Sequence, residues 1–86
     1  MSKPVIDQDG NKFWYNEQGQ RHRLDGPAVI FADGNKAWWS HGKLHREDGP
    51  ANEWANGSKE WYLNDKWYTE EEYVMIQFMN GVNVYG

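Results

Sequence analysis

Residues 9 to 28 read DGNKFWYNEQGQRHRLDGPA, and residues 33 to 51 repeat this stretch as DGNKAWWSHGKLHREDGPA. A third copy, NGSKEWYLNDKWY, occupies residues 56 to 68. Matched tryptophans are 24 residues apart in the first step (14 to 38) and 23 in the second (38 to 61). A period of this length indicates one supersecondary unit copied in tandem. Repeats of this kind favour a scaffold or a binding surface over an enzyme, because catalysis needs one asymmetric site.

Each copy begins with an aspartate or asparagine followed by glycine, which is a strong hairpin signal between alternating runs. The sequence predicts an upstream strand (residues 28–32 and 51–55) and a downstream strand (residues 36–40 and 59–63). In the last hairpin a two-residue loop would set Glu53 opposite Glu60, and facing like charges are unfavourable. We therefore expect a three-residue loop, with Gly57 in the left-handed conformation and Glu53 opposite Lys59.

Side chains alternate between the two faces of a strand. Trp14, Trp38 and Trp61 are therefore expected on one face of the sheet, and their neighbours in sequence on the other. The second row consists of Tyr15, Trp39 and Tyr62. We expect the first row to form core, and the second to be available for a partner, since six tryptophans exceed what one thin layer can hide.

The third copy changes character after Asp65. Thr69 and Glu72 form a capping box, which predicts a helix from Glu70 to Met79. This helix is apolar nearly all round, a pattern typical of a buried helix. We expect it to cap the repeat array on one sheet face.

The predicted fold class is mainly β: an antiparallel β-hairpin repeat meander of about five or six strands, capped by one C-terminal α-helix. One domain is expected over residues 1–86, with repeats at about 9–32, 33–55 and 56–68 and the helix at about 69–80. The chain has no cysteine, so no disulfide stabilises this small domain. Aromatic rings must do so, since each buries on the order of 150–250 Å².

Composition narrows the function classes. The formal net charge of −4 disfavours a non-specific nucleic-acid binder, which would be basic. No signal-peptide pattern and no run near the ~20 apolar residues of a membrane span is present, so a cytoplasmic location is expected. No cofactor motif was found, and no cofactor is expected.

The pattern DG-x-K-x-W-x-x-x-G-x-x-HRxDGPA, followed by YLN and a TEEE helix start, resembles small repeat proteins of bacteriophages and large DNA viruses. The resemblance covers residues 9 to 79. The design is also similar to MORN repeats and to YwqK-type repeats linked to antitoxins, with Asp-Gly-Pro in place of the MORN Gly-x-Gly. The resemblance implies a β-hairpin array, no known catalytic residues and a role in phage–host conflict, in the host cytoplasm if the protein is phage-encoded.

The HRxDGPA motif invites a chemical interpretation. A histidine with an aspartate at matched spacing could act as a general base with its orienter, and two copies could bind a metal. We favour the alternative that arginine pairs with aspartate across the turn while histidine packs on a tryptophan, because residues repeated in every unit serve the repeat itself. We therefore predict no metal site, and assign a structural role to His22, Asp25, Pro27, His45, Asp48 and Pro50.

The predicted function is non-enzymatic binding of a host or toxin-like protein, as an antitoxin-like inhibitor. The predicted partner-binding residues are Tyr15, Trp39, Tyr62, Arg23 and Arg46. A homodimer or larger assembly is also expected, because aromatic rings on both faces of a small sheet mark an interface. Two alternatives stay open: an RNA-binding or RNA-bridging protein that uses its arginines and aromatic rings, and a small nuclease that uses the His-Asp pairs.

Overall fold

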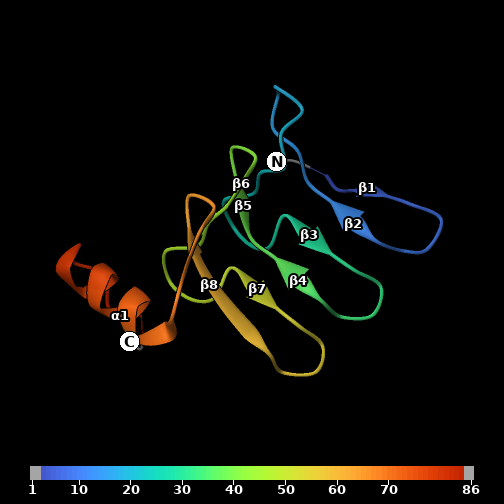
Figure 1. Cartoon of the computed structure of the whole chain (residues 1–86). Coiled ribbons are helices and arrows are strands. Elements are labelled where there is room, and N and C mark those ends of the chain that lie inside the picture. The colour runs from blue at the N-terminus through green and yellow to red at the C-terminus, as the bar shows by residue number, and fades with distance from the viewer. Residues whose placement is uncertain (1–2, 85–86) are drawn as a thin grey trace.

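The computed structural model describes residues 3–84, which form nine short strands and one helix (Figure 1). The helix, α1, spans Glu70–Met79. The strands are β1 (Val5–Ile6), β2 (Lys12–Phe13), β3 (Val29–Ile30), β4 (Lys36–Ala37), β5 (Trp39–Ser40), β6 (Lys43–Leu44), β7 (Asn52–Glu53), β8 (Lys59–Leu63) and β9 (Lys66–Tyr68).

The strands form an antiparallel meander, which confirms the predicted fold class. Seven of them make one sheet in the order β1-β2-β3-β4-β7-β8-β9, and β5 and β6 pair separately. The expected number of about five or six strands was too low. The downstream strand of the second copy breaks at Trp38 into β4 and β5, because β4 pairs with β3 and β7 whereas β5 turns away into an outer hairpin with β6.

The hairpins that begin each copy, here called the inner hairpins, have the predicted register. Glu53 lies opposite Lys59, and Gly57 adopts a φ of 93°. Three residues separate the partner pair Trp54 and Ser58, whose backbone N–H and carbonyl close the loop at 2.9 Å. The charge argument therefore selected the correct loop.

The turns at the opposite ends, here called the outer turns, differ between copies. In the second copy His41 and Gly42 both have positive φ, at 52° and 79°. This is the backbone of a tight two-residue hairpin loop. Asn64 and Asp65 do the same in the third copy, at 51° and 70°. The first copy has one residue more, and its loop turns at Gly19 with a φ of 79°.

The core is thin and uses small residues. Its buried apolar side chains are Trp14, Ala28, Val29, Ala37, Ala51 and Tyr73. Ala28 and Ala51 end the two DGPA motifs and are completely enclosed. Of the predicted tryptophan row, Trp14 is buried, whereas Trp38 and Trp61 are half-buried.

The helix begins as predicted but is not buried as predicted. The Thr69 side chain accepts from the Glu72 backbone N–H, and the Glu72 carboxylate accepts from the Thr69 backbone N–H, so the capping box is confirmed. Only Tyr73 and Gln77 are buried. The helix was expected to be buried against one sheet face. It packs on β8 and β9 at one end of the sheet (Figure 1), and most of its residues stay at least partly exposed.

Candidate functional site

The arginine of each HRxDGPA motif is stacked on the tryptophan of its own copy. The Arg23 guanidinium lies 4.0 Å from the centre of the Trp14 ring, and its Nε donates to Asp25 at 2.8 Å. Its Nη1 donates to the backbone carbonyl of Pro27 at 3.1 Å. The predicted arginine–aspartate pairing is therefore present in the first copy.

The second copy repeats these contacts and adds one. Arg46 lies 3.8 Å from the centre of the Trp38 ring, and donates to Asp48 at 3.0 Å and to the Pro50 carbonyl at 3.1 Å. Its Nη1 also donates to Glu53 at 3.0 Å. Each guanidinium thus ties its DGP turn to a tryptophan, which is a structural task.

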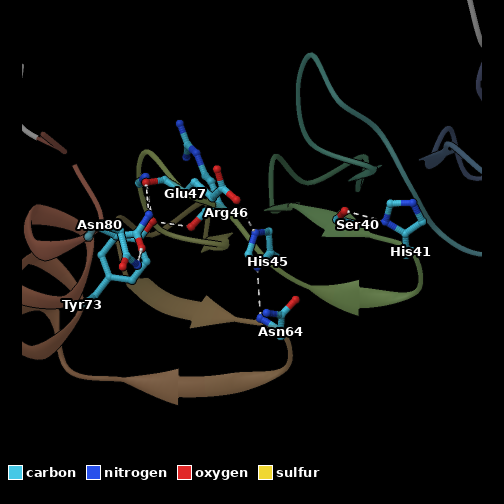
Figure 2. A network of polar contacts seen from close by, with 10 residues as sticks. Ser40, His41, His45, Arg46, Glu47, Asn64, Tyr73 and Asn80 are labelled. Atoms are coloured by element: carbon cyan, nitrogen blue, oxygen red, sulfur yellow. Dashed lines mark hydrogen bonds and ion pairs between the residues drawn. The ribbon is translucent and has the colours of Figure 1, made fainter. Parts of the chain in front are cut away.

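The motif histidines join neighbouring copies. Nδ1 of His22 accepts the backbone N–H of His41 at 3.0 Å. Nδ1 of His45 accepts that of Asn64 at 3.1 Å (Figure 2). Nε2 of His45 lies 3.1 Å from Glu47. The ring contact recorded for His22 is with His41, at 4.4 Å between centroids, whereas packing on a tryptophan was expected. Because Nδ1 of each motif histidine already accepts a backbone N–H, it is not available to act as a general base.

An asparagine makes the equivalent link at the inner hairpins. Oδ1 of Asn11 accepts the backbone N–H of Ala32 at 2.8 Å, and Oδ1 of Asn35 accepts that of Ala55 at 2.6 Å. We call the asparagine and histidine links the inter-copy clamps.

The third copy lacks these clamp residues. Ser58 stands where the earlier copies have asparagine, Tyr68 replaces the histidine, and Thr69 replaces the arginine and caps α1. The last copy thus carries none of the side chains that would hold a following copy. Its sequence ends the array.

The His-Asp pairs of the nuclease alternative are not hydrogen-bonded pairs. Asp25 and Asp48 accept from arginine, and the bond to Arg23 is the main reason that the pKa of Asp25 is lowered. Within residues 3–84 there is no group of three histidine, aspartate or glutamate side chains that could hold a metal ion.

Two grooves follow the repeat. One, of about 740 Å³, lies between the two HRxDGP turns and is lined by Trp38 and Arg46 together with Arg23. The other, of about 550 Å³, is lined by the equivalent Trp14 and Arg23. Leu24 borders both, and its side chain is almost fully exposed. Arg23 and Arg46 in these grooves are already paired with Asp25 and Asp48.

A row of aromatic side chains crosses the outer hairpins. Tyr15, Trp39 and Tyr62 occupy the same position in successive copies. Their cross-strand partners are, in the same order, Arg21, Leu44 and Trp67. Cross-strand partners share a face, so these six side chains form one surface, which we call the aromatic row.

The members of the aromatic row differ in exposure. Tyr15 is exposed, whereas Trp39 and Tyr62 are half-buried. The Arg21 guanidinium lies 5.2 Å from the centre of the Trp39 ring, and the Trp39 Nε1 is buried with no hydrogen-bond partner in the described part of the chain. Burial, followed by Glu60 and Asp65, raises the pKa of Tyr62. The row is therefore packed at its middle and open at its ends.

Arg23 stacks on Trp14 and lines the smaller groove together with Tyr15, which stands at one end of the row. Arg46 stacks on Trp38 and lines the larger groove. The sequence interpretation had grouped these arginines with the aromatic row.

Trp67 was missed. Its side chain is 53% exposed beside Tyr62, at the position that Arg21 and Leu44 hold in the earlier copies. Extending the row from the downstream strands to their cross-strand partners would have included it.

No known protein family, curated protein or solved structure matches this chain. Among residues 3–84 no helix is long and apolar enough to cross a membrane. The fold defines the class at the level of architecture: a helix-capped array of antiparallel β-hairpins.

Proposed function

We propose that this protein acts by stoichiometric binding of a protein partner, without turnover, through the aromatic row. The observation that carries this proposal is the exposed Trp67 beside Tyr62 at the end of a row that runs through all three copies. Trp, Tyr and Arg side chains dominate interface hot spots. The row presents all three types on hydrogen-bonded hairpins, which lowers the ordering cost of binding.

The motif chemistry supports a binding protein as well. His22 and His45 are used as inter-copy clamps, and Arg23 and Arg46 hold their own turns. The residues that invited a catalytic interpretation thus have structural tasks. The resemblance to phage repeat proteins and antitoxin-linked repeats makes a host or toxin-like defence protein the partner we propose.

One observation favours a second candidate, an RNA-binding protein. The Arg21 guanidinium lies between the Phe13 and Trp39 rings, 5.5 and 5.2 Å from their centres. Arginine next to aromatic rings is an arrangement that stacks unpaired bases. The net charge of −4 opposes it, because phosphate binding needs an excess of cations.

The experiment measures affinity and stoichiometry for the partner recovered with the tagged full chain. We expect a 1:1 complex by titration calorimetry, and at least ~10-fold weaker binding for Tyr62→Ala and Trp67→Ala, as hot-spot residues would give. Glu17→Ala, on the exposed first outer turn, is the matched control and should bind normally.

Two results would overturn the proposal. One is a complex whose affinity is unchanged in both aromatic variants. The other is a folded His45→Gln variant that loses all biological effect while the aromatic variants keep it, which would make the motif chemistry the function. Tight, salt-dependent binding of a single-stranded RNA with no protein partner would support the second candidate.

A further inference from the structure

The exposed side of α1 carries an apolar stripe that nothing in the described chain covers. Met75, Phe78 and Met79 are 65%, 70% and 82% exposed. Their spacing of i, i+3 and i+4 places them on one side of the helix, away from the buried Tyr73 and Gln77. We call these three residues the helix stripe.

The helix is attached to the sheet through the buried Tyr73 ring and through hydrogen bonds of Tyr73 and Gln77. The Tyr73 hydroxyl donates to the backbone carbonyl of Arg46, and Nε2 of Gln77 donates to that of Glu47 at 2.8 Å (Figure 2 shows Tyr73 beside Arg46 and Glu47). A capping helix of this kind holds its place without the stripe. Met75, Phe78 and Met79 take no part in this attachment and stay exposed.

The charges on α1 indicate the chemistry of the molecule that would cover the helix stripe. Glu71 and Glu72 lie in the first turn of α1, and its last turn has no basic residue. An acidic stretch on a chain of net charge −4 suits a partner whose contact surface is cationic. It does not suit an anionic lipid surface, which attracts basic helices.

A second copy of this chain is a poorer fit. Two helices packed antiparallel would set the glutamates of each beside the negative end of the other's dipole, where no basic residue compensates. Three side chains on a ten-residue helix also fall short of the ~800 Å² that each partner buries in a standard interface. A groove contacts a helix from both sides as well as from below.

We propose that the helix stripe binds in an apolar groove of a partner protein, with lysine or arginine residues flanking the end that receives the first turn of α1. This is helix-in-groove recognition, in which residues at i, i+3 and i+4 are the anchors. Flexible methionine side chains suit such a groove. The proposal rests on the proposed function in one respect, namely that the partner is a protein, and it uses a surface separate from the aromatic row.

The experiment uses the full chain with the photo-crosslinking residue p-benzoylphenylalanine in place of Phe78, in cells that make the protein. The matched control carries the same group in place of Trp54, another exposed ring, on an inner hairpin loop. We expect one protein to crosslink at position 78 and not at position 54. That protein is then purified and titrated with the unmodified chain and its variants.

The variants separate the apolar and the charged parts of the contact. Met79→Lys, compatible with the helix C-terminus, should weaken binding at least ~10-fold, because an apolar groove does not accept an unpaired charge. Glu71→Gln should weaken binding by ~3-fold or more at low salt and by little at high salt. Circular dichroism confirms that both variants keep the helix.

Each outcome decides the proposal. Crosslinking of position 78 to a second copy, absence of any crosslinked protein, or a partner that binds Met79→Lys with unchanged affinity overturns it. If Tyr62→Ala weakens the complex and Met79→Lys does not, the proposed function stands and this inference fails. If only Met79→Lys weakens it, the helix stripe is the site and the aromatic row is not.

Discussion

Removing one oxygen atom, in Tyr73→Phe, should loosen the attachment of α1. The ring is completely buried, and its hydroxyl donates to the Arg46 carbonyl and accepts the Gly49 N–H at 3.3 Å. The variant leaves both backbone groups without this partner. An unsatisfied buried group costs about 1–3 kcal/mol, so we expect a loss of ~2 kcal/mol in the free energy of unfolding.

The same hydroxyl gives the variant a pH signature. Burial raises the pKa of Tyr73 from 10.0 to about 12. A raised folded-state pKa contributes stability that is fully present below pH 10 and is lost as the pH rises through 12. A shift of this size corresponds to about 2–3 kcal/mol. The stability advantage of the wild type over Tyr73→Phe should therefore shrink between pH 10 and pH 12.

Thermal melts and urea titrations followed by circular dichroism test both statements. At neutral pH the melting temperature should fall by roughly 10 °C, since 1 kcal/mol moves a domain of this size by about 4–8 °C. Tyr15→Phe, on an exposed ring, is the control and should melt like the wild type. A melting temperature of Tyr73→Phe within 2 °C of the wild type, which corresponds to a loss of less than about 0.5 kcal/mol, would refute the reasoning. So would a difference between the two proteins that stays constant to pH 12.

Three further changes test the clamps and the arginine stacks by urea denaturation. Asn35→Ala should lower the free energy of unfolding by about 1–2 kcal/mol, because the Ala55 N–H loses its acceptor. Ser58→Ala, at the same position in the last copy, should be nearly neutral, and equal losses in the two variants would contradict the clamp assignment. His45→Ala should also lower the free energy of unfolding by about 1–2 kcal/mol, because the Asn64 N–H in the third outer turn loses its acceptor. An unchanged denaturation midpoint would show that this link is dispensable. Arg46→Ala should destabilise more than Arg23→Ala, because only Arg46 also holds Glu53, and the reverse order would be inconsistent with the stacked geometry.

Local chemistry made the hairpins predictable. The register at Glu53 and Lys59 followed from like-charge repulsion and from a glycine able to take positive φ. The helix bounds followed from the reciprocal bonds of Thr69 and Glu72. Each of these features depends on residues close in the chain, so the interactions that favour it can be compared with those of its alternatives from the sequence alone.

Features that depend on distant packing were not predictable in the same way. The apolar composition of α1 indicated burial, but its depth depends on how much sheet lies beneath it, and only β8 and β9 do. The histidine links needed the outer turn of the next copy to come within 3.1 Å of a ring nitrogen, which no spacing rule reveals. Trp67 was accessible to sequence reasoning, because it lies within the third copy, but the row was traced along the downstream strands only and not to their cross-strand partners.

The clamps connect only adjacent units, and the middle unit makes the same kind of hydrogen bond to the unit before it as to the unit after it. It binds the first through the His41 N–H and the third through the His45 ring. A duplicate of the 23-residue segment from 38 to 60, inserted in series, would meet a matching junction on either side. The stability of such an array grows by one unit and one junction at a time. Gene duplication or design can therefore lengthen this protein without inventing a new core, provided that the terminal unit stays last.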